Sequence, residues 1–274
     1  KYIRKIWRDN TEEERLLGVS LTGIMDNQYL NGYYPDYADE KDAIFVLRKC
    51  LKELKQEAIS TNEKLAKKLD IPVSAAITCV KPSGTVSQLV DSASGIHPRH
   101  SQYYIRTVRG DNKDPLTKFM KDVGVPHEPA IASETSVTVF SFPCKAPEEG
   151  SVTRDKLNAI WHLALWKEYA EHWCEHKPSI TVSVREHEWL EVGARVYKNF
   201  DHLSGVSFLP YSEHTYKQAP YQECTEQEYK ELLERIPSDI DWASLQNFEK
   251  EDTTTGSQEL SCTAEVCEVV DIGT

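Results

Sequence analysis

Long hydrophobic runs are missing from this sequence. No apolar stretch approaches the roughly 20 residues that a membrane-spanning helix requires, and the charged start KYIRKIWRDN lacks the hydrophobic core of a signal peptide. We therefore expect a cytoplasmic protein with no membrane partner. The chain begins at Lys1 without an initiator methionine, so we also expect a fragment of a longer protein.

An excess of positive charge is missing as well. The chain has 32 lysine and arginine residues against 44 aspartate and glutamate residues, which gives a formal net charge of −12. A protein without a broad basic face cannot displace the counterions of a phosphate backbone. Nucleic acid is therefore not an expected partner.

The sequence also lacks the cysteine pattern of a disulfide-stabilised protein. The seven cysteines are an odd number, and an acidic chain of 274 residues with no export signal is not expected to depend on structural disulfides. Most of these thiols should be small core residues. Only Cys262 and Cys267, in the segment SCTAEVC near the carboxyl end, form a close pair.

Enough apolar material is present for a globular core, since 39% of the residues are hydrophobic. Helical and extended patterns alternate along the chain. The helical patterns cover 11–27, 40–70, 153–176 and 225–235, and the extended ones cover 74–80, 103–110, 136–143, 179–186 and 205–211. Interleaved strands and helices predict the α/β class.

The carboxyl end has a different composition. From Phe248 onward the sequence is rich in acidic, Thr, Ser and Gly residues, with too few bulky apolar groups to offset the chain entropy of folding. We therefore divide the chain into a folded portion, 1–247, and a mobile tail, 248–274.

The segment KPSGTVSQ (81–88) follows a short apolar strand and could carry chemistry. Gly84 allows close backbone approach, and Ser83 or Thr85 can cap the next helix, so the free N–H groups of its first turn could bind phosphate. The segment lacks the spacing of a Walker A loop. An ordinary strand-to-helix turn is the alternative.

The segment HWCEH (172–176) formally matches the H-x-x-E-H pattern of some zinc enzymes. His172 and His176 lie one helical turn apart, so both could bind one zinc ion with Glu175 as the general base of a hydrolase. Against this, Pro178 ends the helix almost at once, and matches of five residues arise easily by chance.

Basic side chains gather in residues 94–110, and the residues concerned are His97, Arg99, His100, Arg106 and Arg109. In an acidic chain such a cluster suggests either a local anion site or a set of ion pairs, and the sequence leaves both open. The mixed charges of REHEW (185–189) predict a solvated strand end.

Several segments, in the expected order, resemble one enzyme family. They are RLLGVSLTGI (15–24), KPSGTVSQLVDSASGIHPRHSQYYIRTVR (81–109), VFSFPCKAP (139–147), EHWCEHKPSITVSVREHEW (171–189) and SGVSFLPYSEHTYKQAPYQE (204–223). Together they resemble the C-terminal part of the adenosylcobalamin-dependent, monomeric type (class II) of ribonucleoside-triphosphate reductase. In that family HWCEH is a structural segment, which weakens the zinc hypothesis.

The resemblance implies a fold and a substrate site. The family fold is a ten-stranded α/β barrel, of which this chain would supply the later part. The turn formed by Pro82, Ser83, Gly84, Thr85 and Val86 matches the family's turn that holds the phosphates of a ribonucleoside triphosphate through main-chain N–H groups. The enzyme reduces that substrate to the 2′-deoxyribonucleoside triphosphate by thiyl-radical chemistry with adenosylcobalamin as cofactor.

The resemblance also gives the terminal cysteines a role. Cys262 and Cys267 match a pair that reduces the active-site disulfide and is then reduced by thioredoxin. The four intervening residues can bend enough to allow a disulfide. Neighbouring acidic residues are expected to raise the pKa of both thiols.

Part of the family machinery is missing from this sequence. No N-P-C-x-E segment for the radical cysteine is found, Cys79 matches no catalytic motif, and the sequence does not say which residues contact the cobalamin. The N-terminal part of the reductase is therefore an expected partner, and the chain alone should be inactive. A non-enzymatic reading, an acidic partner-binding domain with a redox-labile tail, is the remaining alternative.

Overall fold

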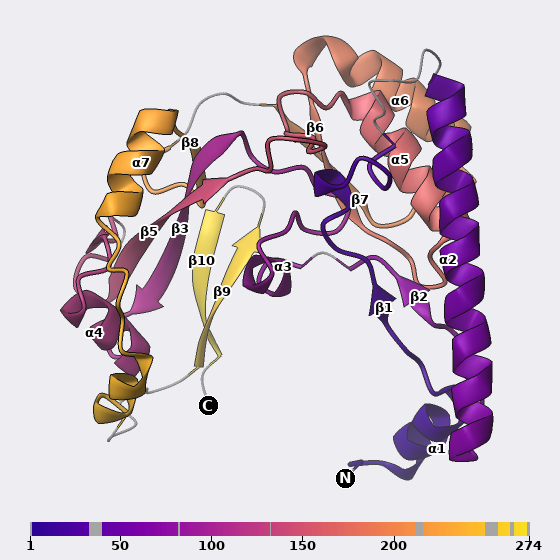
Figure 1. The fold of residues 1–274 in the computed structure, drawn as a ribbon, viewed down its shortest axis with the longest axis horizontal. Coiled ribbons are helices and arrows are strands. Elements are labelled where there is room, and N and C mark those ends of the chain that lie inside the picture. The colour runs from indigo at the N-terminus through magenta and orange to yellow at the C-terminus, as the bar shows by residue number, and fades with distance from the viewer. Residues whose placement is uncertain are drawn as a thin grey trace. The chain divides into compact units, whose positions relative to one another are not determined.

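The computed structural model describes residues 2–32, 40–81, 83–131, 133–211, 216–249, 257–263 and 266–272 (Figure 1). The chain forms two compact units, one of Lys1–Arg99 with Ala146–Ser212 and one of His100–Lys145 with Glu213–Thr274. Among the described residues, no helix is long and apolar enough to span a bilayer.

The first unit mixes helices with pairs of parallel strands. Its elements are α1 (Lys5–Glu14), β1 (Val19–Ser20), η1 (Ile24–Asp26), α2 (Glu40–Leu69), β2 (Thr78–Cys79), α3 (Val86–Leu89), α5 (Ala159–His172), β6 (Ile180–Val184), η2 (Glu186–Glu188), α6 (Trp189–Lys198), η3 (Phe200–His202) and β7 (Val206–Pro210). Strand β1 pairs with β2, and β6 pairs with β7, both in parallel. Parallel strands need a crossover between them, which α2 supplies for the first pair and α6 for the second.

Helix α5 is central to the core of the first unit. Trp166 and Tyr169 are among its fully buried side chains, and they pack in the same cluster as Leu47 of α2 and Val182 of β6. Figure 1 shows α2 running alongside α5. An ion pair also joins these helices, because Arg48 Nε and Nη2 donate to the two carboxylate oxygens of Glu168 at 2.9 and 2.8 Å.

The second unit is built on an antiparallel sheet with strand order β4-β5-β3-β8. Its elements are β3 (Tyr103–Asp111), α4 (Pro115–Asp122), β4 (His127–Pro129), β5 (Val137–Lys145), β8 (Tyr221–Glu223), α7 (Glu226–Glu234), η4 (Trp242–Asn247), β9 (Ser257–Thr263) and β10 (Val266–Ile272). Strands β9 and β10 pair with each other as an antiparallel hairpin and, among the described strands, with no other. Helix α7 begins with a capping box, because Thr225 and Glu228 each accept the other's backbone N–H.

Most of the predicted elements are present, and the α/β class is confirmed. The helices predicted at 40–70 and 225–235 appear as α2 and α7, and the strands predicted at 103–110, 136–143, 179–186 and 205–211 appear as β3, β5, β6 and β7. The helix predicted at 153–176 is shorter, since α5 begins at Ala159, and only Thr78–Cys79 of 74–80 is a strand. A ten-stranded barrel is not shown by the sheets of the described residues.

Two predictions are wrong. Residues 11–27 are not one helix, because α1 ends near Arg15 and the chain then pairs with the segment around β2: Leu17 N–H donates to Ala76 O and Val19 N–H to Ile77 O. Residues 185–189 do not continue strand β6, which ends at Val184, because residues 186–188 form η2 and Trp189 begins α6. The buried Glu188 carboxylate there accepts the backbone N–H of Ala159 at 3.1 Å.

Candidate functional site

The candidate phosphate-binding turn follows a firmly held strand. Both residues of β2 are buried, and the indole Nε1 of Trp173 donates to Cys79 O at 2.8 Å. The Glu175 carboxylate accepts the N–H groups of Ile77 at 2.7 Å and Thr78 at 3.2 Å. The backbone directly before the turn is therefore held in place by Trp173 and Glu175. The first residue of the turn, Pro82, lies outside the described residues.

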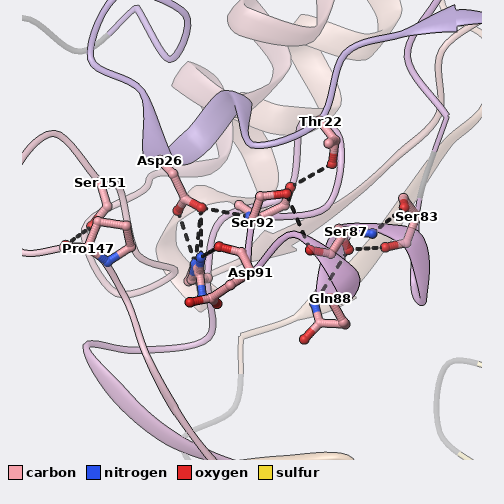
Figure 2. Close-up of polar contacts among 11 residues, drawn as sticks. Thr22, Asp26, Ser83, Ser87, Gln88, Asp91, Ser92, Pro147 and Ser151 are labelled. Carbon is pink, nitrogen blue, oxygen red and sulfur yellow. Dashed lines mark hydrogen bonds and ion pairs between the residues drawn. The ribbon is translucent and has the colours of Figure 1, made fainter.

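Serine hydroxyls define the shape of the turn. Ser83 N–H donates to Ser94 Oγ at 2.8 Å, and Ser83 Oγ in turn accepts the N–H of Ser87 at 2.8 Å. The Ser87 hydroxyl donates back to Ser83 O (Figure 2). Ser83 is therefore the side chain that caps the short helix α3, and its own amide is engaged within the chain.

Gly84, Thr85 and Val86 form the outer part of the turn. A Cβ added to Gly84 would meet no heavy atom within 4 Å, so the space beside this residue is open. Among the described residues, the amides of Ser83, Ser87, Gln88 and Leu89 donate hydrogen bonds within the chain, and no acceptor is found there for the amides of Thr85 and Val86. Two neighbouring backbone N–H groups in such a turn are suited to an anion.

Asp26 and Asp91, which Figure 2 shows to one side of Ser83 and Ser87, form an ion cluster with the buried Arg99. The Arg99 side chain is 4% exposed and pairs with Asp26 at 2.9 Å and Asp91 at 3.0 Å. The Asp26 carboxylate also accepts the N–H of Ala93 at 2.7 Å. Arg99 is therefore committed to carboxylates of its own chain, which supports the ion-pair alternative for this residue.

The other members of the predicted basic cluster also have partners within the chain. His97 Nδ1 contacts Ser94 O at 3.1 Å and its Nε2 accepts the N–H of Thr181 at 3.0 Å, which requires a neutral ring. Burial lowers the pKa of His97. His97 and Arg99 belong to the first unit, whereas the remaining three residues belong to the second.

Those three residues make contacts within the second unit. The His100 ring stacks on the ring of Tyr221, and the Arg106 guanidinium lies over the same ring at 5.9 Å from its centroid. Arg109 Nη2 donates to Gln218 O at 3.0 Å. Within the second unit, these contacts hold the three side chains close to the sheet edge at β8.

The zinc hypothesis is wrong. Helix α5 ends at His172, whose Nε2 lies 3.3 Å from Glu168, and His176 Nε2 contacts Leu17 O at 2.8 Å. The carboxylate of Glu175, the predicted general base, instead accepts the backbone N–H groups of Ile77 and Thr78. The described residues contain no group of three or more His, Cys, Asp or Glu side chains arranged to hold a metal ion.

The terminal cysteines lie on the hairpin β9–β10. Cys262 and Cys267 are direct partners in its antiparallel register, one pair away from the end of the strands at Thr263 and Val266. Directly opposite residues have Cα atoms about 4.5–5.5 Å apart. That separation lies within the roughly 4.4–6.8 Å that a disulfide requires.

Sequence reasoning located the turn and the cysteine pair but missed Ser94 and Asp26. Neither residue belongs to a motif, and Asp26 is 73 positions from its partner Arg99. The signal that could have found Asp26 is its place directly after the apolar residues Ile24 and Met25, because a carboxylate buried there needs a partner such as Arg99.

Comparison with known proteins gives relatives of one kind, although no family model matches the chain. The chain is 30% identical to a probable adenosylcobalamin-dependent ribonucleoside-triphosphate reductase of Dictyostelium discoideum, over 96% of this chain and 33% of the relative. It is 27% identical to the adenosylcobalamin-dependent ribonucleoside-triphosphate reductase of Euglena gracilis, over 95% of this chain and 35% of that protein.

A solved structure is also similar. It is a crystal structure of a B12-dependent (class II) ribonucleotide reductase, with a TM-score of 0.72 and 23% identity, over 89% of this chain and 36% of that one. At this identity the likeness concerns the fold. The chain spans about a third of the length of the curated relatives it matches. The resemblance found in the sequence is confirmed.

Proposed function

We propose that this chain, a homologue of one portion of the adenosylcobalamin-dependent ribonucleoside-triphosphate reductases, supplies two parts of such an enzyme. The turn at 82–86 binds the substrate phosphates, and Cys262 with Cys267 delivers electrons from thioredoxin. The complete enzyme would reduce ribonucleoside triphosphates to 2′-deoxyribonucleoside triphosphates. The single observation that carries this proposal is the similarity to reductases over 96% of the chain.

The geometry of the turn supports phosphate binding. Gly84 leaves room for a phosphate to approach the backbone, and the amides of Thr85 and Val86 could donate to its oxygens. Hydrogen bonds between serines fix the start of the turn, because Ser83 N–H donates to Ser94 Oγ and Ser87 N–H donates to Ser83 Oγ. A preorganised set of donors binds an anion without an ordering cost.

The hairpin register supports the proposed role of the cysteines. In each turnover the substrate loses its 2′ hydroxyl as water and gains hydrogen at that carbon, while two active-site thiols become a disulfide. A thiolate of the tail attacks that disulfide and releases one active-site thiol, which leaves a mixed disulfide. The second tail thiol then attacks the tail sulfur of the mixed disulfide and releases the other active-site thiol. The tail leaves as a Cys262–Cys267 disulfide, which the dithiol of thioredoxin reduces.

The rest of the reductase is needed for this chemistry. The parallel pairs β1–β2 and β6–β7, joined by helical crossovers, are suitable pieces of a larger α/β barrel. We propose that the N-terminal part of the enzyme supplies the remaining strands and the radical cysteine. Adenosylcobalamin supplies the radical when bound, but the small hydroxyls and amides of the turn suit a phosphate and not a corrin ring.

The test is to assay the chain in one polypeptide or complex with an upstream reductase portion. A ribonucleoside triphosphate, adenosylcobalamin and thioredoxin with its reducing system are supplied, and the deoxyribonucleotide product is measured. We expect product only when both portions and adenosylcobalamin are present. Product formation that does not require this chain, or none with a demonstrably folded complex, would overturn the proposal.

A further inference from the structure

We infer that Ser94 is a positioning residue for the phosphate turn, which rests on the function proposed above. Its hydroxyl accepts the N–H of Ser83 at 2.8 Å, although the two residues lie on different segments. Ser94 contributes no group to the outer part of the turn. It acts through Ser83, by fixing the direction in which the following amides point.

The conformation of Ser83 at the start of the turn depends on hydrogen bonds to other segments. Gly84 does not adopt a positive φ angle, so the turn is not set by a left-handed glycine. Ser83 is instead held at both its backbone and its side chain, since its N–H donates to Ser94 Oγ and its Oγ accepts from Ser87 N–H. Loss of the first of these contacts would remove the hydrogen bond that joins Ser83 to the segment of Ser94.

Ser94 is itself anchored to rigid parts of the first unit. Its carbonyl accepts the backbone N–H of His97 at 2.9 Å and faces the ring Nδ1 of the same residue at 3.1 Å. The other ring nitrogen of His97 accepts the N–H of Thr181 on β6. The preceding residue, Ala93, is held by the carboxylate of Asp26.

The segment that carries Ser94 also lies directly against the start of the turn. A Cβ added to Gly95 would be only 3.2 Å from Lys81 O, and Gly95 has a φ of +52°. Only glycine accepts both this close approach and this backbone angle without strain. The distance between the two segments is therefore set by backbone packing. The Ser94 hydroxyl bridges them by accepting the N–H of Ser83.

If Ser94 only positions the turn, its loss should affect substrate binding and leave the chemical step unchanged. Without the Ser94 hydroxyl, the Ser83 amide loses its acceptor and the turn samples other shapes, so the triphosphate must order it on binding. In this proposal Ser94 acts on the phosphates through Ser83 and takes no part in the chemistry at the ribose. We therefore expect the KM for a ribonucleoside triphosphate to rise by roughly 3- to 10-fold in Ser94→Ala, with kcat unchanged.

The experiment compares variants of the complete reductase. Ser94→Thr keeps the hydroxyl and should restore the KM, and inorganic triphosphate should inhibit Ser94→Ala more weakly by the same factor. Ser101→Ala is the matched control, because this buried serine also makes one hydrogen bond, to Tyr103 O at 2.7 Å, but in the second unit. Its KM should equal that of the wild type.

The outcomes distinguish the two proposals. If Gly84→Val raises the KM and Ser94→Ala does not, the positioning role is wrong and the phosphate turn stands. If neither variant changes the KM, the phosphate turn is wrong and the role of Ser94 falls with it. An equal rise in Ser94→Ala and Ser101→Ala, or a Ser94→Ala defect confined to kcat, would also overturn the inference.

Discussion

Arg99 and Asp26 form a buried ion pair, in which Arg99 Nε lies 3.1 Å from Oδ1 and Nη2 lies 2.9 Å from Oδ2 of Asp26. The pair joins η1 to the segment that follows α3, although 73 positions separate the two residues. Because Asp26 also accepts the N–H of Ala93, this one carboxylate holds both Arg99 and the segment that carries Ser94.

Asp26→Asn is expected to destabilise the first unit strongly. The change leaves the Arg99 guanidinium buried without its main counterion, and loss of one partner of a buried pair costs about 3–5 kcal/mol. The measurement is the thermal unfolding midpoint of the complete reductase. Asp91→Asn is the matched control, because the Asp91 side chain is 88% exposed and should lose less than about 1 kcal/mol. Equal effects of the two variants would contradict the central role of Asp26.

Buried histidines should make the stability of the first unit depend on pH. His162 is 3% exposed, its Nε2 lies 2.7 Å from Ile96 O, and burial lowers its pKa to about 4. In the unfolded chain a histidine has a pKa of about 6.5, so the unfolded state binds the proton more tightly. Stability is therefore complete above pH 6.5 and falls as the pH drops towards 4, by up to about 3 kcal/mol for this group.

The measurement is urea unfolding between pH 4 and pH 8. His162→Gln retains an N–H donor for Ile96 O but cannot titrate, so its stability should fall less steeply with decreasing pH than that of the wild type. His97 adds to the wild-type slope in the same direction, because its pKa is also lowered by burial. A His162→Gln profile that is parallel to the wild-type profile would refute the assignment.

Gly84→Val tests the open space beside the phosphate turn. A Cβ at this position meets no heavy atom within 4 Å, so the folded chain accepts the side chain, but a bound phosphate would meet it. Loss of one hydrogen bond to a charged phosphate raises KM by roughly tenfold or more. Gly193→Val on α6 is the control, since its Cβ would also meet nothing within 4 Å, and it should leave KM unchanged. An unchanged KM in Gly84→Val would exclude the turn as a phosphate site.

The elements that the sequence predicted well are those with strong local patterns. Strands β3 and β5 and helices α2 and α7 carry their periodicity in consecutive residues, so their bounds could be read to within about two residues. The segment 11–27 failed because its conformation depends on distant partners. Its helical pattern ends where Leu17 and Val19 pair with residues near β2.

The site was predicted unevenly for the same reason. Gly84 and Ser83 are residues typical of turns, so the sequence predicts the turn from neighbouring positions. The acceptor of the Ser83 amide is Ser94, on a separate segment, and no local pattern in the sequence predicts that contact. The motif HWCEH suggested a zinc site because its spacing matches H-x-x-E-H, but spacing alone does not determine which groups each side chain contacts. Glu175 has the right position for a zinc enzyme, but backbone amides occupy its carboxylate.

The tail cysteines provide the most direct test of electron delivery. Cys262→Ser in the complete reductase should abolish turnover with thioredoxin but retain most of it with a small dithiol such as dithiothreitol, because only a large reductant needs the tail as a carrier. Cys267→Ser should behave in the same way, since the two residues are direct partners in the hairpin register. The measurement is the rate of deoxyribonucleotide formation with each reductant.

Cys224→Ser is the control for these two variants. Burial raises the pKa of the Cys224 thiol to about 11, so it is almost entirely protonated at neutral pH and is a poor nucleophile. Its loss should leave both rates unchanged. If Cys262→Ser lowered the two rates equally, the cysteine would serve the active site itself or the fold. If it lowered neither, thioredoxin would reach the active-site disulfide without this hairpin, and the relay would be excluded.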